Sequence, residues 1–325
     1  AAFPLAAGTA VVAKPSEHTP LVAVHLAQLL CEAGLPSGLF SVVTGYGPDC
    51  GKRLVEHPQV AGIAFTGSTQ VGAIIGAEAT RRMKRVQLEL GGKNPVIVLA
   101  DMDPQEAAAE VAAGAFFHAG QICMSGSRVI VEAPIVETFT DALVEEARKL
   151  RFGSLTDADT AYGPLICAEA LDRVDQHVRE AVAAGAVLRT GGVVQGGWTY
   201  APTVLRDPPK DSLSWREETF GPVVTVSSVP DMEAAIDAAN DSAYGLSAAV
   251  LTHDMSRAMD AARRIRAGAV HLGMHSFQSN AMAPVGGVGA SGLGRSGGRY
   301  SIEHFTELKW ISLQVGRSAR RGSAP

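Results

Sequence analysis

Two hydrophobic patterns alternate along the first ninety residues of the chain. Short apolar runs predict buried strands, and apolar residues that recur every three or four positions predict helices. The expected strands are 11–13, 40–44, 62–66 and 86–90. The expected helices are 21–33, 47–56 and 68–82. This alternation predicts an α/β protein with a parallel, doubly wound sheet.

The first expected helix has recognisable start and stop signals. Thr19 is expected at the N-cap, Pro20 occupies the first helical position and Gly34 follows the end. The alternation continues beyond Gly92, which predicts a second α/β domain with its boundary at residues 91–94. There the expected strands are 95–99, 129–132, 223–229 and 248–251. The expected helices are 104–118, 135–150, 171–184, 232–240 and 255–265.

Composition narrows the classes of partner. The net charge is −5 and no basic face is evident, so we expect neither nucleic acid nor membrane as a partner. None of the four cysteines forms a C-x-x-C pair and no His cluster has zinc spacing, so we expect no metal. Free thiols fit a reducing cytoplasm, which is the expected location. The first residues resemble the middle of a domain, so an upstream segment is expected.

Two side chains indicate covalent catalysis when they are taken together. Glu89 begins the run Glu-Leu-Gly-Gly-Lys, and Cys123 ends the run Gly-Gln-Ile-Cys. A thiol can attack an electrophilic carbon while a carboxylate activates the water that releases the product. Such a thiol is expected to be exposed and partly ionised. Taken singly, a buried cysteine is usually a small hydrophobe and a lone glutamate a surface charge.

Three further segments could hold a nucleotide. The turn from Gly67 to Gly72 joins an expected strand to a helix and offers backbone N–H groups to a pyrophosphate, or is a plain tight turn. It is neither a Walker A loop nor a G-x-G-x-x-G fingerprint. The run 14–17 leaves the first strand with an acid that could bind a ribose, or is a solvated loop. The run 217–222 places an acid beside an aromatic, or is a helix end with a core Phe.

Six motifs occur together in one order: KPSE at 14–17, FTGST-x-x-G at 65–72, ELGGK at 89–93, GQIC at 120–123, EETFGP at 217–222 and SGLGR at 291–295. With them the chain resembles the aldehyde dehydrogenase superfamily from its first residues to about residue 313. The runs FFHAGQICMS at 116–125 and FTELKWISLQ at 305–314 resemble the benzaldehyde, vanillin and salicylaldehyde branch.

The resemblance implies an architecture and a division of the chain. It implies an incomplete doubly wound parallel-sheet cofactor domain, a second α/β catalytic domain and a short C-terminal oligomerisation strand. We assign the partial dinucleotide-binding domain to 1–91, the catalytic domain to 92–295 and a C-terminal return to 296–315. The return would carry the oligomerisation strand at 309–313, which implies a homodimer or homotetramer. The polar residues 316–325 are expected to be a disordered tail.

Site residues also follow from the resemblance. It implies that Cys123 is the nucleophile and Glu89 the general base for an aldehyde substrate. The implied cofactor-binding residues are Lys14 and Glu17 at the adenosine ribose, Ser68 at the pyrophosphate, Glu218 at the nicotinamide ribose, Phe220 near the nicotinamide, and Ser16, Gly45, Gly67, Gly72 and Leu90. Glu17 favours NAD, because a carboxylate repels a 2′-phosphate, although NADP is possible.

Three departures from the family pattern leave alternatives open. The catalytic Asn motif of the family is absent from the chain, Val285 stands where a Phe is usual, and Ser296 stands where a Glu is frequent. We expect oxidation of an aldehyde, aromatic by the finer resemblance, to its acid. The activity of this chain alone stays open, because the missing Asn motif allows a truncated, non-catalytic chain or assembly subunit. A coenzyme A-acylating relative is the third alternative, and Glu89 counts against it.

Overall fold

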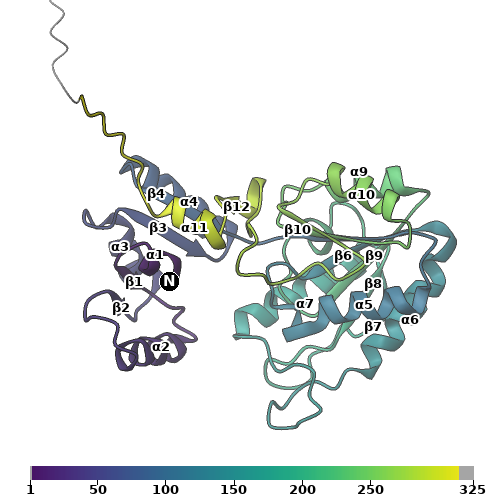
Figure 1. Ribbon diagram of the computed structural model, residues 1–325. Helices are drawn as coiled ribbons and strands as arrows, with labels where there is room; N and C mark the ends of the chain where they lie inside the picture. The colour runs from purple at the N-terminus through teal and green to yellow at the C-terminus, as the bar shows by residue number, and fades with distance from the viewer. Residues whose placement is uncertain (1, 315–325) are drawn as a thin grey trace, which may run out of the picture.

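The structure, a computed structural model, describes residues 2–314 and consists of two lobes (Figure 1). The smaller lobe holds the N-terminal elements together with β12 and α11 from near the end of the described residues. Its helices are α1 (Ala2–Ala6), α2 (Pro20–Glu32), α3 (Lys52–Glu56), α4 (Thr69–Arg81) and α11 (Gly298–His304). Its strands are β1 (Val11–Ala13), β2 (Phe40–Val42), β3 (Gly62–Thr66), β4 (Arg85–Glu89) and β12 (Gly292–Leu293).

The strands of the smaller lobe form two short sheets. β1 and β2 pair in parallel, and β3 and β4 pair in parallel with β12 antiparallel to β4. Because parallel strands share one direction, the loops after β1 and β2 begin at one edge of their sheet, and the loops after β3 and β4 begin at one edge of theirs. Those four loops carry most of the cofactor-binding residues implied by the sequence.

The larger lobe is a seven-stranded sheet in the order β11-β10-β5-β6-β9-β8-β7. Its strands are β5 (Asn94–Val98), β6 (Gly126–Glu132), β7 (Val187–Thr190), β8 (Thr203–Arg206), β9 (Val223–Val229), β10 (Ser247–Leu251) and β11 (Ala269–Leu272). Its helices are α5 (Pro104–Phe116), α6 (Val136–Lys149), α7 (Ala168–Ala183), α8 (Leu213–Arg216), α9 (Met232–Asn240) and α10 (Met255–Arg264). Only β7 pairs antiparallel to its neighbour.

Helices cover both faces of the larger sheet (Figure 1). In β5, Val96 and Val98 pack with α5 and α6, whereas Ile97 packs with α9 and α10 on the other face. Successive strand residues point to opposite faces, so an uninterrupted apolar run fills two cores. The predicted α/β class with parallel sheets is confirmed.

Several element boundaries match the prediction and others shift. The strands 62–66 and 223–229 and the helix 232–240 have the predicted bounds. The expected helix 47–56 begins as a π-helical turn over Gly47–Gly51. Thr19 lies at the N-cap of α2, but its side chain makes no capping hydrogen bond. The elements α1, β7, β8, α8, β11, β12 and α11 were not predicted.

The C-terminal region differs from the predicted division. β12 pairs with β4 from residue 292, so the chain has returned to the smaller lobe before the expected return at 296. Within residues 307–314 the structure assigns no strand, and the expected oligomerisation strand 309–313 is exposed along its length. The expected tail 316–325 lies outside the described residues. The division into domains stays a prediction. Across residues 2–314, no helix combines the length and apolar character that crossing a membrane requires.

Candidate active site

The connection between the lobes brings the motif residues together. The chain passes from β4 to β5 through Leu90, Gly91, Gly92 and Lys93, all of which are buried. A Cβ atom on Gly91 would lie 2.4 Å from Glu218 Oε2, and one on Gly92 would lie 2.9 Å from the Cys123 carbonyl oxygen. A Cβ at Gly92 would meet backbone, so glycine is required there, whereas a Cβ at Gly91 would displace the Glu218 carboxylate.

Cys123 lies in the turn between the 3₁₀ helix Phe117–Gly120 and β6. The Asn94 side-chain amide donates to the Cys123 carbonyl (2.8 Å) and to the Ser125 carbonyl (2.9 Å). Ser276 Oγ donates to the Met124 carbonyl (2.6 Å). These bonds fix the backbone on both sides of the thiol, so its position is set by β5 and by the segment after β11.

The electrostatic state of the thiol differs from the expectation. Cys123 is half-buried, and burial raises its pKa, with further increases from the negative charges of Glu218 and Glu89. The expected exposed, partly ionised thiol is therefore wrong for this structure. Glu218 at Gly91 and the Cys123 carbonyl at Gly92 lie beside consecutive residues of the β4–β5 connection, two and three residues after Glu89.

Glu89 ends β4 with its carboxylate held by two neighbours. Oε1 accepts hydrogen bonds from Gln87 Nε2 (3.0 Å) and from Ser296 Oγ (3.0 Å). Burial raises the pKa of the Glu89 carboxyl, and these two hydrogen bonds and the Arg295 charge oppose that increase. Ser296, identified as a departure from the family pattern, is thus a direct partner of Glu89.

Val285 contributes to the same corner of the site. It forms backbone hydrogen bonds with Ser296 in both directions, 2.8 Å from its own N–H and 2.6 Å to its carbonyl. This two-residue bridge holds the Ser296 hydroxyl beside Glu89.

The implied cofactor residues follow the carboxyl ends of parallel strands. Lys14 Nζ donates to the Gly45 carbonyl (3.0 Å) and pairs with Glu17 (3.6 Å), which links the loops after β1 and β2. The Ser16 hydroxyl accepts from the His18 N–H (3.3 Å). The pKa of the Glu17 carboxyl is lowered by its own backbone N–H and by Lys14, against a weaker effect of burial.

The loop after β3 enters α4. Ser68 is the N-cap of α4, and its Oγ accepts from the Val71 N–H (3.3 Å). A Cβ on Gly67 would lie 2.5 Å from the Phe65 ring, and one on Gly72 would lie 2.4 Å from the Leu90 side chain. The two glycines therefore allow β3, α4 and the segment after β4 to pack closely, while the first turn of α4 presents N–H groups at its end.

Glu218 and Phe220 lie in the loop before β9. Glu218 Oε1 accepts from the Gly92 N–H (3.1 Å). Burial raises the pKa of Glu218, and the Gly92 hydrogen bond and the charges of Arg173 and Lys93 oppose the increase. Phe220 has φ +53°, an uncommon conformation for an aromatic residue, at the bend that turns the chain into β9.

The donor set suits a dinucleotide. Lys14 and Glu17 follow the end of β1, Glu89 lies at the end of β4, and the N-terminus of α4 follows β3. Open parallel sheets bind nucleotides at such strand ends. The structure brings Glu89, Leu90, Cys123 and Glu218 into one site. It places Lys14, Ser16, Glu17 and Gly45 in neighbouring loops, and Gly67, Ser68 and Gly72 around the start of α4.

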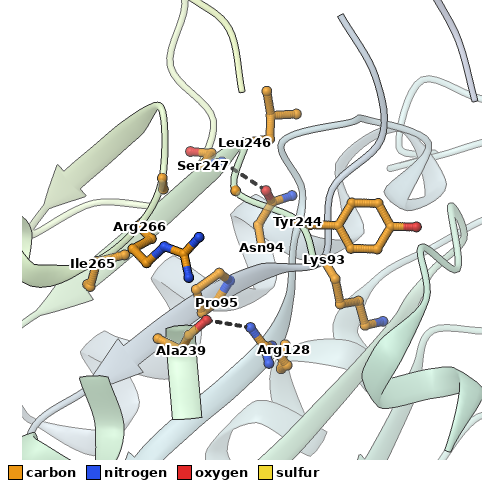
Figure 2. Close-up of a pocket in the computed structure, with 12 residues that line it drawn as sticks. Lys93, Asn94, Pro95, Arg128, Ala239, Tyr244, Leu246, Ser247, Ile265 and Arg266 are labelled. Atoms are coloured by element: carbon orange, nitrogen blue, oxygen red, sulfur yellow. Dashed lines mark hydrogen bonds between the residues drawn. The ribbon is translucent and has the colours of Figure 1, made fainter. Parts of the chain in front are cut away.

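A pocket is lined by Lys93 together with Asn94 and Arg128, and the last two make structural contacts (Figure 2). There Asn94 Oδ1 accepts from the Ser247 N–H (3.0 Å), which ties β5 to β10. The Arg128 guanidinium donates to the carbonyls of Ala238, Ala239 and Asp241 at the end of α9, where a cation is favourable. Burial lowers the pKa of Arg128 to about 10.

Some site residues were missed by sequence reasoning. Asn94 follows the Glu89–Lys93 run directly, so that motif could have been extended by one residue. No motif includes Arg173 or His177. Thr219 lies inside the 217–222 run, but no feature of that run distinguishes it from its neighbours.

The comparison with family models decides the relationship. The model of the aldehyde dehydrogenase family matches residues 1–311. The chain belongs to the aldehyde dehydrogenase family. Among curated relatives, a vanillin dehydrogenase of Pseudomonas fluorescens is 41% identical over 97% of this chain and 66% of its own length. A phenylacetaldehyde dehydrogenase of the same species is 42% identical over 95% and 62%. A betaine aldehyde dehydrogenase of Brucella melitensis is 41% identical over 96% and 65%.

Solved aldehyde dehydrogenases share the fold. An NAD-dependent aldehyde dehydrogenase from Sinorhizobium meliloti superposes with a TM-score of 0.94 at 40% identity, covering 97% of this chain and 63% of that one. A betaine aldehyde dehydrogenase from Staphylococcus aureus in complex with NAD⁺ has a TM-score of 0.89 at 36% identity, with 92% and 60% covered. The chain spans 62–66% of the length of the three curated relatives.

Proposed function

We propose that this chain carries the catalytic residues of an NAD-dependent aldehyde dehydrogenase that releases a carboxylic acid. The observation that supports this most is the close approach of Glu218 to Gly91 and of the Cys123 backbone carbonyl to Gly92, two residues that follow Glu89 in the chain. A thiol in the same site as a half-buried carboxylate that can accept a proton from water is the arrangement that acyl-enzyme hydrolysis requires.

The proposed chemistry assigns one role to each group. The Cys123 thiol first releases its proton to solvent, and the thiolate attacks the aldehyde carbon to form a thiohemiacetal, whose oxyanion is stabilised by the Cys123 backbone N–H. Lys14, Glu17, Ser68 and Glu218 would hold a nicotinamide dinucleotide, which would supply the hydride acceptor for this step. Glu89 then takes a proton from the water that attacks the thioester, and the acid leaves with regeneration of the thiol. Glu17 favours NAD over NADP, as proposed from the sequence.

Aromatic side chains beside the Cys123 turn support an aromatic aldehyde as substrate. The rings of Phe117 and Phe277 stack with centroids 5.7 Å apart, and His275 lies against Phe277 at 4.4 Å. The Ser276 hydrogen bond to Met124 places this cluster next to the nucleophile turn. Offset aromatic faces favour a flat ring over a short aliphatic chain.

Self-association is the second part of the proposal. The segment 308–313 exposes Leu308, Trp310, Ile311 and Leu313. A contiguous apolar segment of this kind is typical of an interface, and an extended segment can add a strand to a partner. We propose a homodimer or homotetramer formed through this segment.

A single-turnover experiment tests the catalytic proposal. Purified chain in excess over benzaldehyde is mixed with NAD, and NADH is followed by absorbance. The expected result is NADH formation that is lost in Cys123→Ala and retained in Cys167→Ala, a matched half-buried cysteine at the start of α7. Equal NADH formation by both variants would show that Cys123 is not the nucleophile, and no NADH from the unaltered chain would support a non-catalytic subunit instead. A product that forms only when coenzyme A is added would support the acylating alternative.

A further inference from the structure

The lysine that ends the Glu89–Lys93 run has no role in the chemistry proposed above. Lys93 is 1% exposed, directly after the glycines that face Glu218 and Cys123. Its Nζ donates to Thr219 Oγ1 (3.3 Å). A buried lysine is costly to desolvate, so a site that retains one is expected to use its hydrogen bond or its charge.

The Thr219 hydroxyl also contacts a buried histidine. His177 Nδ1 of α7 lies 3.1 Å from Thr219 Oγ1, and His177 is 3% exposed. Lysine can only donate while it is protonated, so Thr219 Oγ1 accepts from Lys93 and donates its own proton. With a neutral imidazole protonated on Nε2, His177 Nδ1 accepts that proton; the other tautomer would make Thr219 Oγ1 accept twice and leave its own proton without a partner among the bonds of the described residues.

The same loop is anchored by two more hydrogen bonds. Arg173, one turn before His177 on α7, donates from Nε to the Thr219 carbonyl (3.2 Å). The Gly92 N–H donates to Glu218 Oε1 (3.1 Å). Two consecutive residues, Glu218 and Thr219, are therefore held from the β4–β5 connection on one side and from α7 on the other.

We propose that Lys93, Thr219 and His177 form a buried hydrogen-bond relay that positions Glu218 toward the cofactor. The cofactor part of this inference rests on the proposed function, whereas the relay and its effect on Glu218 concern the chain itself. Lys93 and His177 are positioning residues: they act through Thr219, and Thr219 fixes the backbone from which the Glu218 carboxylate projects.

The charges around the relay agree with this polarity. Burial, followed by the charges of Lys93 and Arg173, lowers the pKa of His177 to about 4, which keeps the ring neutral. Burial and the Arg128 charge lower the pKa of Lys93 to about 7, against the charge of Glu218, so the ammonium that donates to Thr219 is the main form of Lys93 below about pH 7. Lys93 and Arg173 in turn oppose the increase that burial causes in the pKa of Glu218.

Amide hydrogen exchange at Gly92 reports the position of Glu218 without any cofactor. Thr219→Val keeps the shape of the side chain and removes the hydroxyl, whereas Thr219→Ser keeps the hydroxyl. Thr225→Val is the matched control, since Thr225 is equally buried and its hydroxyl donates to the Ser127 carbonyl (3.1 Å) in β6. We expect Gly92 exchange at least fivefold faster in Thr219→Val, and within twofold of the unaltered chain in the other two variants. The proposal is overturned if Gly92 exchange in Thr219→Val is less than fivefold faster than in the unaltered chain. It is also overturned if Thr225→Val accelerates Gly92 exchange as much as Thr219→Val does.

Nuclear magnetic resonance of the imidazole nitrogens tests the direction of the relay. The His177 signal, identified by its loss in His177→Asn, is expected to show an unprotonated Nδ1 and a protonated Nε2 at pH 7. A proton on Nδ1 contradicts the relay. His177→Asn places an amide oxygen where Nδ1 was, so it should preserve slow Gly92 exchange, whereas His177→Leu should resemble Thr219→Val.

Calorimetric titration with NAD separates this inference from the proposed function. The dissociation constant is expected to rise at least fivefold in Thr219→Val and in His177→Leu, and less than twofold in Thr219→Ser. If the unaltered chain binds NAD and Thr219→Val binds it equally well, the relay does not position Glu218 for the cofactor. If no variant binds NAD, the cofactor proposal fails, and Gly92 exchange with the imidazole protonation still decides the relay.

Discussion

At the scale of single residues, His177 makes stability depend on pH in a predictable direction. Its folded pKa of about 4 lies below the unfolded value near 6.5, so the unfolded chain binds more protons between these values. Stability contributed by the neutral ring is complete above the unfolded pKa and is lost as pH falls toward the folded pKa. Between pH 7 and pH 5 the expected loss in the free energy of unfolding is about 2 kcal/mol.

Urea unfolding at the two pH values measures this loss. His177→Asn should remove most of the pH dependence, because the asparagine does not titrate. His25→Asn, which changes an exposed histidine on α2, should leave the dependence as it is in the unaltered chain. A pH dependence that survives His177→Asn would show that other groups cause it.

The two chemistry-bearing residues could be identified from their sequence context, but their environment could not. Cys123 and Glu89 stand in recognisable runs, yet the backbone around the thiol is held by Asn94 of β5 and by Ser276 after β11, which are distant in the sequence. Likewise the relay joins His177 to Thr219 across 42 residues and Lys93 to Thr219 across 126. Hydrogen bonds of this range leave no periodic pattern in the chain.

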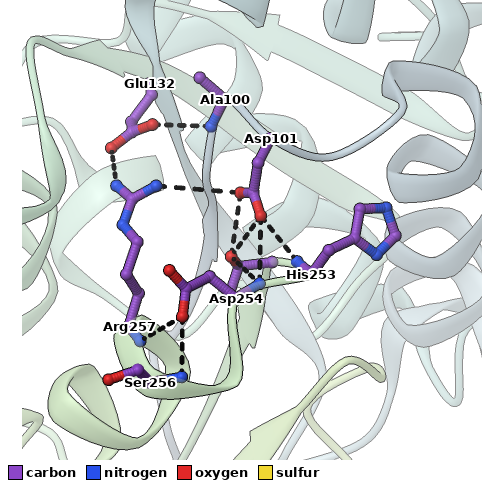
Figure 3. A network of polar contacts seen from close by, with 8 residues as sticks. Ala100, Asp101, Glu132, His253, Asp254, Ser256 and Arg257 are labelled. Atoms are coloured by element: carbon purple, nitrogen blue, oxygen red, sulfur yellow. Dashed lines mark hydrogen bonds and ion pairs between the residues drawn. The ribbon is translucent and has the colours of Figure 1, made fainter.

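At the scale of elements, one arginine of α10 joins two strands of the larger sheet (Figure 3). Arg257 pairs with the buried Glu132 of β6 (2.7 Å) and lies 3.9 Å from Asp101, which follows β5. Asp101 accepts hydrogen bonds from the Thr252 hydroxyl and the His253 N–H, which holds the turn before α10.

Loss of this arginine leaves the Glu132 carboxylate without its charged partner. Arg257→Met is expected to lower the free energy of unfolding by about 1–3 kcal/mol, the cost of an unpaired buried group. Arg264→Met on the same helix removes exposed pairs with Glu233 and Asp260 and should cost less than about 1 kcal/mol. Urea unfolding of both variants provides the comparison, and equal losses would mean that the pairing with Glu132 is no more important than a surface contact.

The predictability of elements follows their hydrophobic pattern. The strand 223–229 could be located because three of its four buried residues are valines, and α9 because its apolar positions repeat with helical spacing. β7 has no buried residue, and β12 is two residues long. Both depend on pairing with a partner strand, which a local pattern does not reveal.

At the scale of the whole molecule, apolar surface is concentrated away from the larger sheet. α2 has no buried residue, and Leu21 and Val22 are 78% and 77% exposed. The segment 308–313 is also exposed to solvent, and the Trp310 side chain is 92% exposed. The larger lobe, by contrast, buries four of its strands completely or nearly so.

This distribution predicts where the chain associates. Trp310→Glu should shift the molecular mass measured by light scattering toward that of a monomer, because a charge in an apolar contact is costly. Met83→Glu, at a residue 93% exposed on the turn after α4, is the matched control and should leave the mass unchanged. An unchanged mass in Trp310→Glu would place any association elsewhere.

The central claim is that Cys123 and Glu89 act in sequence on one acyl group. Intact-protein mass spectrometry after mixing the chain with NAD and benzaldehyde tests it directly. Glu89→Gln is expected to accumulate a benzoyl adduct on Cys123 with about one NADH formed per adduct, because thioester hydrolysis slows more than hydride loss. The matched control Glu145→Gln, on the exposed face of α6, should hydrolyse any adduct at the rate of the unaltered chain. Absence of an adduct in Glu89→Gln, or an adduct on another cysteine, would contradict the account.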